Sequence, residues 1–343
     1  MATHSILGLD IGGANLKAAT ADKRAISVPF ALWKQPDRLP AALGELVARF
    51  PDAEELAVTM TGELCDCFET KREGVNAILN AVLNVSRSRP VRVWGTDGLF
   101  HSIETARRHY LTVAAANWHA LATFAGQFAP GYEGAHALLI DTGSTTTDII
   151  PILHGVPTAT GSTDTERLAS GELVYVGVRR TPVSAILGFE VAAELFATTQ
   201  DVYLLLGKIP DDRTDTDTAD GRPAVRDRAH ARMARMKCAD VELMTREEAV
   251  DLAREVHQRI LGRLLSAVRQ ALSMNRNRQP DWDDFPFRVI TSGAGEFVAH
   301  EVASGLHPGL HGILSLNTAL GPAVSACAPA YAVAVLATER GLP

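Results

Sequence analysis

The stretch that decides the fold is Leu138 to Ile152, LLIDTGSTTTDIIPI, which resembles an earlier stretch, Leu7 to Ala19, LGLDIGGANLKAA. Each stretch has an apolar run, an aspartate, a glycine-containing turn and a second apolar run, an order typical of two strands joined by a tight turn. The sequence therefore predicts one β-hairpin that occurs twice. Aligning the two aspartates, Asp10 and Asp141, pairs Gly12 with Gly143, Asn15 with Thr146 and Lys17 with Asp148.

Both predicted turns have the composition of a phosphate-binding loop. Glycines and short polar side chains allow several backbone N–H groups to point at one spot, which suits the oxygens of an anion. The second turn carries four consecutive hydroxyl residues, from Ser144 to Thr147, a run better suited to an anion than to a core. The phosphate-binding candidates are Gly12, Gly13, Asn15 and Lys17 in the first hairpin and Gly143, Ser144, Thr145 and Thr146 in the second.

The acidic residues of the hairpins are candidate metal ligands. Asp10 and Asp141 end the first strand of each hairpin, and Asp148 lies on a returning strand. Mg²⁺ prefers hard oxygen ligands and usually keeps several waters, so these carboxylates predict a magnesium site beside the phosphate. One such hairpin alone would be an ordinary Asp-Gly turn, and the repeat is what favours function.

Composition limits the possible classes of protein. The chain has 343 residues, 46% of them hydrophobic and 21% charged, which indicates two ordinary globular domains. The net charge of −7 disfavours a nucleic-acid partner. No apolar run approaches the length of a membrane span, and no basic leader precedes the first strand, so we expect a cytoplasmic protein. Four scattered cysteines favour free thiols over a disulfide framework, and also over a metal site at Cys65 and Cys67.

Strands alternate with helices along the rest of the chain, which predicts an α/β fold with functional loops at strand ends. Two such loops carry Glu63 and Asp97, and we expect both to open toward Asp10. A strand over 173–178 is also predicted. The run from 210 to 235 has few apolar residues and is predicted to be a mobile insertion. Thr245 and Glu248 form a predicted capping box at the start of a long helix that reaches residue 274.

A third glycine turn, Ser292-Gly293-Ala294-Gly295, joins a strand to a helix. Such a turn lets a charged or flat ligand approach the backbone at a helix N-terminus, so Gly293 and Gly295 are further phosphate-binding candidates. A steric role in the strand–helix connection is the alternative interpretation.

Two Asp-Gly hairpins followed much later by a glycine turn resemble the acetate and sugar kinase, heat-shock chaperone and actin superfamily. Within it the chain resembles the hydantoinase/oxoprolinase family, on the quoted stretches LDIGGAN (9–15), MTGEL (60–64) and DTGSTTTD (141–148). AANW (115–118), RTP (180–182) and residues 212–221 extend the likeness to the short members linked to tetrahydromethanopterin-dependent one-carbon transfer.

The superfamily resemblance implies two ribonuclease-H-like domains with a ligand cleft between them. We expect the first domain to contain residues 1–115 and 322–343, and the second to contain residues 116–321, with the mobile insertion near 210–235. The apolar helix expected over 319–339 could serve a homodimer interface or the core of the first domain, so the oligomeric state stays open.

Among the archaeal short members are condensing enzymes of methanofuran biosynthesis. The resemblance therefore implies a transferase that joins a furylmethyl diphosphate to the phenol of a glutamyl-tyramine or tyrosine-type acceptor, with Mg²⁺ and without ATP. Glu63 or Asp97 is the expected general base, Asp10 is expected to act with the metal, and Arg180 is expected to contact the diphosphate or a glutamyl carboxylate.

Two other functions stay open at this point. One is an ATP-dependent kinase or hydantoinase-like amidohydrolase, as in the wider superfamily and the longer members of the family. The other is a nucleotide-sensing protein that binds without turnover. The chain is short and lacks the large extra domains of the longer relatives, which favours the transferase.

Overall fold

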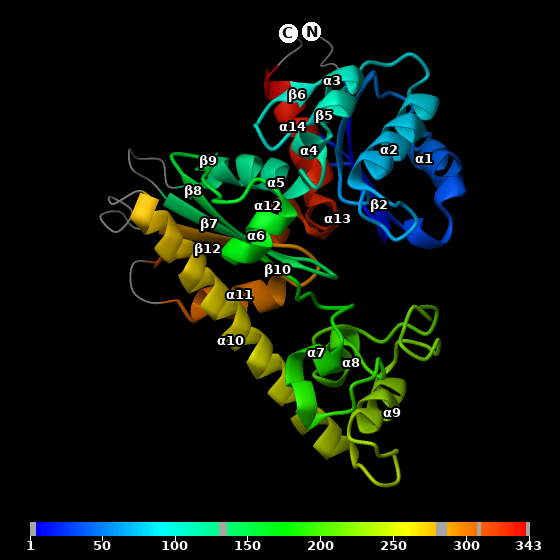
Figure 1. Ribbon diagram of the computed structural model, residues 1–343, viewed down its shortest axis with the longest axis vertical. Helices are drawn as coiled ribbons and strands as arrows, with labels where there is room; N and C mark the ends of the chain where they lie inside the picture. Colours follow the sequence, from blue (N-terminus) through cyan, green and yellow to red (C-terminus); the bar gives the residue numbers. More distant parts are fainter. Residues whose placement is uncertain (1–4, 130–135, 279–286, 307–309, 341–343) are drawn as a thin grey trace.

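The computed structural model describes residues 5–129, 136–278, 287–306 and 310–340. Within these ranges the strands form two six-stranded sheets, each built around one of the repeated hairpins (Figure 1). The fold is α/β, as predicted. The residue boundaries expected for the two domains stay a prediction.

The first sheet has the order β3-β2-β1-β4-β5-β6. Its central strand β1 is antiparallel to β2 and parallel to β4, and all six of its residues are buried. Apart from Asp10 the strand has no polar side chain, because helices cover both faces of the sheet. The strands are β1 (Ile6–Ile11), β2 (Asn15–Thr20), β3 (Ala25–Pro29), β4 (Glu55–Met60), β5 (Val91–Trp94) and β6 (Phe100–His101).

The second sheet has the order β10-β8-β7-β11-β12, with β9 paired to β8. Here β7 is antiparallel to β8 and parallel to β11, which repeats the arrangement around β1. The strands are β7 (His136–Thr142), β8 (Thr147–Leu153), β9 (Val156–Pro157), β10 (Leu173–Val174), β11 (Phe287–Ser292) and β12 (Leu310–Ser315).

Three layers of helices cover the two sheets. Helices α1 (Leu39–Val47) and α2 (Lys71–Ser86) pack on the outer face of the first sheet, and α10 (Arg246–Arg278) and α11 (Glu296–Ser304) pack on the second. Between the sheets lie α5 (Asn117–Ala125) and α14 (Ala328–Arg340), which contact each other. Both central helices are rich in alanine and therefore pack closely. A Cβ on Gly8 of β1 would lie 1.9 Å from the carbonyl oxygen of Ala330 in α14.

Shorter elements complete the chain. The predicted last helix is three helices, because the backbone leaves helical geometry at Gly321, with φ +89°, and again at Cys327. The remaining elements are η1 (Leu32–Lys34), η2 (Pro36–Arg38), α3 (Ile103–Arg108), α4 (Tyr110–Val113), η3 (Gly126–Phe128), α6 (Asp164–Ser170), α7 (Val183–Leu187), η4 (Gly188–Glu190), α8 (Thr199–Leu205), α9 (Arg226–Met236), α12 (Leu316–Leu320) and α13 (Pro322–Ala326).

Two predictions around the second hairpin had different outcomes. The capping box of α10 is confirmed, since Thr245 and Glu248 each accept a hydrogen bond from the backbone N–H of the other. The strand expected over 173–178 ends at Val174. The next residues pack against the turn of the second hairpin, and the N–H of Val178 donates to the carbonyl of Gly143 at 3.0 Å.

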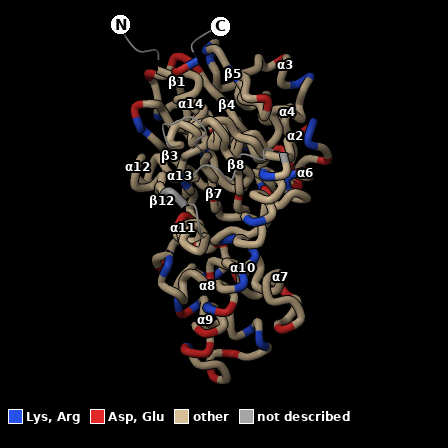
Figure 2. Tube along the Cα trace, turned by 90° about the vertical axis from the view of Figure 1, so that its left-hand side faces the viewer, with Lys and Arg blue, Asp and Glu red and all other residues tan. Residues whose placement is uncertain are grey.

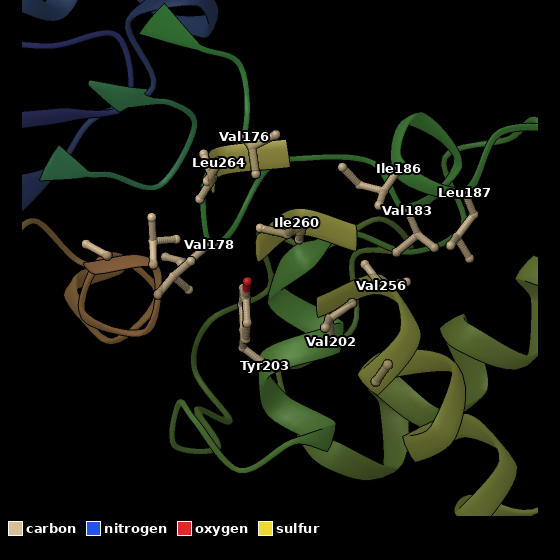
Figure 3. Packing of buried hydrophobic residues seen from close by; sticks show 14 of the residues in the cluster. Val176, Val178, Val183, Ile186, Leu187, Val202, Tyr203, Val256, Ile260 and Leu264 are labelled. Atoms are coloured by element: carbon tan, nitrogen blue, oxygen red, sulfur yellow. The ribbon is translucent and has the colours of Figure 1, made fainter. Parts of the chain in front are cut away.

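The run from 210 to 235, predicted to be a mobile insertion, lies in a distal lobe and includes most of α9. Its mobility stays a prediction. Helices α7, α8 and α9 pack on one end of α10, which extends from the sheets into this lobe (Figure 1). Figure 3 shows Val202 and Tyr203 beside Val256 and Ile260 of α10.

The distal lobe is ordered partly by buried charge. Acidic and basic residues lie interspersed along its chain (Figure 2). Arg232, with a fully buried side chain, donates to Asp201 at 2.7 Å and to Asp220 at 2.9 Å. Breaking a buried pair of this kind strongly destabilises a fold, so these residues add to the apolar packing of the lobe on α10. No helix in the described part of the chain is both long enough and apolar enough to cross a membrane.

Candidate functional site

The two hairpins face one cavity of about 550 Å³ between the sheets. All eight predicted phosphate-binding residues of the hairpin turns line it. In the first turn the N–H of Gly12 donates to the carbonyl of Asn15 at 3.0 Å, and in the second Gly143 donates to Thr146 at 2.8 Å. The equivalent bonds confirm that one hairpin occurs twice. The roles of these residues in binding phosphate stay a prediction.

The acidic residues of the two hairpins converge on one lysine. Strand pairing places Lys17 opposite Asp10 and Asp148 opposite Asp141. The Nζ of Lys17 lies 3.3 Å from Oδ2 of Asp10. Burial opposes the charged form of Lys17, but the charges of Asp10 and Asp141 outweigh it and raise its pKa. One ammonium group therefore interacts with an aspartate from each hairpin.

Asp141 is held in an environment that favours its protonated form. Burial is the largest cause, followed by the charge of Asp148, and Lys17 offsets them only partly, so the pKa of Asp141 is raised to about 7. Its Oδ1 and the Oδ1 of Asp10 are both buried without a hydrogen-bond partner. Buried carboxylate oxygens usually have a partner, so both atoms are suited to a ligand or a cation.

Asp148, predicted to bind metal, pairs instead with a buried arginine. Arg167 in α6 is 1% exposed and donates to Asp148, to Asp164 and to the carbonyl of Glu172. Its guanidinium carbon also lies 4.1 Å from the ring centroid of Trp118. The sequence analysis missed Arg167, and the only local signal is the Thr163–Glu166 capping box that begins its helix.

The described residues contain no cluster of three or more histidine, cysteine, aspartate or glutamate side chains placed to hold a metal. Lys17 and Arg167 already neutralise two of the three predicted ligands. The unpartnered oxygens of Asp10 and Asp141 nevertheless fit a magnesium ion held largely by water and phosphate, which needs few protein ligands.

Glu63 lies in the turn after β4 and lines the same cavity. It is 1% exposed, and its Oε2 has no hydrogen-bond partner. Burial raises the pKa of Glu63 to about 7, against the opposing effects of backbone N–H groups and of Lys71. A Cβ on Gly74 of α2 would lie 2.0 Å from the carbonyl oxygen of Glu63. The helix backbone therefore packs directly against the turn that carries Glu63.

Asp97 lies outside the cavity, contrary to the expectation that its loop opens toward Asp10. Its Oδ1 accepts a hydrogen bond from the N–H of Leu99 at 3.2 Å and lies 3.0 Å from Nε2 of His101. The physical reason is strand order. In the first sheet β4 separates β5 from β1, so the loop after β5 starts further from the hairpin than the loop that carries Glu63.

Gly293 and Gly295 also lie outside the cavity lining, and their role in the structure is steric. A Cβ on Gly293 would lie 2.2 Å from the carbonyl oxygen of Thr142, and one on Gly295 would lie 2.6 Å from Cγ2 of the same threonine. These glycines let the third turn pack directly on the second hairpin. The structure therefore does not support the prediction that they bind phosphate.

Aromatic and charged residues line the cavity away from the hairpin turns. Trp33 of η1 and Arg180, which follows β10, both line it, and the guanidinium carbon of Arg180 lies 4.6 Å from the indole centroid of Trp33. Tyr175 and Cys65 also line the cavity. Burial raises the pKa of the Cys65 thiol to about 11, and all four cysteines are free.

Two α/β halves with repeated hairpins around a polar cavity give the chain a two-domain, actin-like fold. A solved ROK family glucokinase from Streptomyces griseus, in complex with glucose and AMPPNP, shares this fold at a TM-score of 0.50 and 15% identity, over 98% of this chain and 100% of that one. The sequence profile of the hydantoinase/oxoprolinase family matches residues 54–340. The chain belongs to that family.

Two archaeal relatives are similar to the chain over much of its length. Both are named (4-{4-[2-(gamma-L-glutamylamino)ethyl]phenoxymethyl}furan-2-yl)methanamine synthase. The protein from Methanocaldococcus jannaschii is 34% identical, over 98% of each chain. The one from Methanococcus vannielii is 31% identical over 59% of this chain and 90% of its own.

Proposed function

We propose that the protein is a transferase of methanofuran-type biosynthesis. It joins a furylmethyl diphosphate to the phenol of a glutamyl-tyramine-type acceptor, forms an aryl ether and releases pyrophosphate. The name of the two relatives describes such a product, a furan bonded through a phenoxymethyl group to a glutamylated aminoethyl chain. The observation that carries the proposal is that Glu63, with a pKa of about 7, lines the same cavity as both hairpins.

The hairpins would bind the diphosphate. Their turns offer backbone N–H groups and the hydroxyls of Ser144, Thr145 and Thr146, and Lys17 supplies a cation. These groups are fixed before the substrate arrives, so they can stabilise the negative charge that develops on the leaving group. Mg²⁺ bound near Asp10 and Asp141, largely through water, would add Lewis-acid neutralisation of that charge.

The bond changes balance without a further reactant. The bond between the furylmethyl carbon and the diphosphate oxygen breaks, and its electron pair leaves with pyrophosphate. A lone pair of the phenol oxygen forms the new C–O bond, and the phenol proton passes to a base. The furan ring donates electron density to the adjacent carbon, so this carbon tolerates positive charge as the leaving group departs.

Glu63 fits the role of that base. A phenol has an unperturbed pKa of about 10 and must lose its proton as the ether forms. A carboxylate with a pKa of about 7 is ionised at neutral pH and is a stronger base than an ordinary glutamate. The unpartnered Oε2 of Glu63 leaves an acceptor free for the phenol proton.

The test is to incubate the purified protein with Mg²⁺ and an aminomethylfuran-methyl diphosphate, with and without γ-glutamyl-tyramine. We expect pyrophosphate release that depends on the phenol, together with an aryl ether detected by mass spectrometry. A parallel incubation with ATP in place of the diphosphate tests the kinase alternative. ADP formation there, or pyrophosphate release that ignores the phenol, would contradict the proposal.

A further inference from the structure

Arg180 is a cation of the cavity lining without an acidic partner. Within the described ranges its side chain makes no ion pair or hydrogen bond, and its guanidinium stacks on the indole of Trp33. The neighbouring Arg179 differs, because its guanidinium donates to Asp215 at 2.7 Å and also pairs with Asp217. Two aspartates of the distal insertion therefore neutralise Arg179, whereas Arg180 lines the cavity and has no acidic partner within the described ranges.

The contact between Arg180 and Trp33 joins segments that follow strands of the two different sheets. Trp33 follows β3 of the first sheet, whereas Arg180 follows β10 of the second. The backbone N–H of Arg180 donates to the carbonyl of Ser144 at 3.0 Å, which anchors the main chain on the second hairpin. Its guanidinium therefore has a defined position over the indole ring, with N–H groups in its plane available to a ligand.

Arg180 and Lys17 differ in exposure, because the side chain of Arg180 is exposed whereas Lys17 pairs with the buried Asp10. The charge of Arg180 acts on two other residues of the lining. It lowers the pKa values of the Cys65 thiol and the Tyr175 phenol, although burial raises both overall. The charges that act most on Lys17 and Asp141 come from residues of the hairpins and, for Lys17, also from Cys327. The cavity therefore has two cations of different exposure, Lys17 beside the buried Asp10 and the exposed Arg180 beside Trp33.

This second cation matches one end of the acceptor. A γ-glutamyl amide keeps a free α-carboxylate and a free α-amino group at the end opposite the phenol. When the phenol reaches Glu63, that end must extend away from the buried turn, toward the more exposed residues of the lining. An arginine fork binds a carboxylate with two parallel hydrogen bonds, and an aromatic ring beneath it keeps the fork in place.

We propose that Arg180, supported by Trp33, binds the α-carboxylate of the glutamyl group and so selects glutamylated acceptors over tyramine itself. The inference rests on the proposed function, and it assigns Arg180 to the acceptor rather than to the diphosphate. Arg180 is then a specificity-determining residue, and Trp33 is a positioning residue that acts through it.

The test compares three acceptors at saturating furylmethyl diphosphate. Glutaryl-tyramine keeps the carboxylate but lacks the amino group, 4-aminobutanoyl-tyramine keeps the amino group but lacks the carboxylate, and γ-glutamyl-tyramine has both. We expect Arg180→Gln to raise KM for the two carboxylate-bearing acceptors about 10- to 100-fold, the loss typical of a charge-assisted hydrogen bond. KM for 4-aminobutanoyl-tyramine and KM for the diphosphate should not change.

Matched variants separate this effect from a general loss of charge or fold. Arg213→Gln removes one exposed positive charge outside the cavity lining and should leave all four KM values unchanged. Trp33→Leu should raise KM for the carboxylate-bearing acceptors, and Trp33→Phe should restore most of the affinity. Thermal melting of each variant establishes that it is folded.

The outcomes distinguish this inference from the proposed function. An equal loss with all three acceptors, a raised KM for the diphosphate, or unchanged selectivity in Arg180→Gln would overturn the inference while ether formation continued. Absence of ether formation by the wild-type protein would overturn the proposed function. Calorimetric binding of γ-glutamyl-tyramine and 4-aminobutanoyl-tyramine to wild type and Arg180→Gln tests the carboxylate subsite without turnover.

Discussion

The ammonium of Lys17 lies 3.3 Å from Oδ2 of Asp10, its partner on the adjacent strand of the first hairpin. The equivalent position of the second hairpin holds Asp148, opposite Asp141. The two copies of the hairpin thus differ in charge at one position, and the cation supplied by the first partly offsets the acidic residues of both. This asymmetry suits a cavity that must accept a multiply charged anion.

Replacing Lys17 tests its role toward the diphosphate. We expect Lys17→Met to lower kcat/KM for the diphosphate by about 100-fold or more, because an aligned cation that stabilises developing charge is worth several kcal/mol. KM for the acceptor should stay the same. Steady-state kinetics with each substrate varied in turn measures both values, and equal effects on the two substrates would argue against a role at the leaving group.

Replacing Glu63 tests the base. Glu63→Gln keeps the size of the side chain but cannot accept the phenol proton, so we expect kcat to fall about 10²- to 10⁴-fold. Binding of the diphosphate should persist, since Glu63 is not a hairpin residue. Single-turnover kinetics together with a binding measurement distinguishes the two effects, and a variant that keeps most of its turnover would exclude Glu63 as the base.

The activity should depend on pH through the same carboxyl group. Its pKa is raised to about 7, so the base form is lost as the pH falls below that value. We expect kcat/KM for the acceptor to fall about tenfold per pH unit below pH 7 and to level off above it. A profile that stays flat between pH 5 and pH 7 would be inconsistent with general-base catalysis by this residue.

The raised pKa also predicts how stability changes with pH. A carboxyl whose folded-state pKa exceeds its unfolded value binds its proton more tightly in the native state, so its contribution to stability falls as the pH rises from about 4.5 to about 7. We therefore expect Glu63→Gln to be more stable than wild type at pH 8, by up to about 3 kcal/mol, but not at pH 4.5. Urea unfolding at both pH values measures this difference.

The buried Arg167 should be important for stability. Arg167→Met leaves Asp148 without its partner, and removing one member of a buried ion pair typically costs about 3 to 5 kcal/mol. Arg254→Met, which breaks the exposed pair with Asp251, is the matched control and should change stability little. Similar free energies of unfolding for the two variants would contradict a structural role for Arg167.

The sequence predicted those parts of the site that depend on local pattern. The hairpins are confirmed because strand, aspartate and glycine turn are contiguous in the chain, and Glu63 reached the cavity because its loop follows the strand adjacent to β1. Asp97 was misplaced because strand order is not visible in a sequence. Arg167 was missed because its partners, Trp118 and Asp148, are distant in the chain.

The distal insertion shows the same limit of pattern-based prediction. Arg232 and Asp220 lie in a run with few apolar residues, and the structure buries the guanidinium of Arg232 between Asp201 and Asp220. Buried ion pairs form between residues that no periodicity connects. The alternative interpretation of Gly293 and Gly295, a steric role, agrees with their close packing on Thr142, and phosphate binding by these two glycines stays a prediction.

The central claim is that the cavity between Asp10 and Asp141 holds a diphosphate as the leaving group of carbon–oxygen bond cleavage. The most direct measurement uses a furylmethyl diphosphate with oxygen-18 at the oxygen that bridges carbon and phosphorus, with γ-glutamyl-tyramine as acceptor. The account predicts that all of the label appears in pyrophosphate and none in the aryl ether. Label retained in a furylmethyl monophosphate, beside a phosphorylated acceptor, would show phosphoryl transfer and contradict the account.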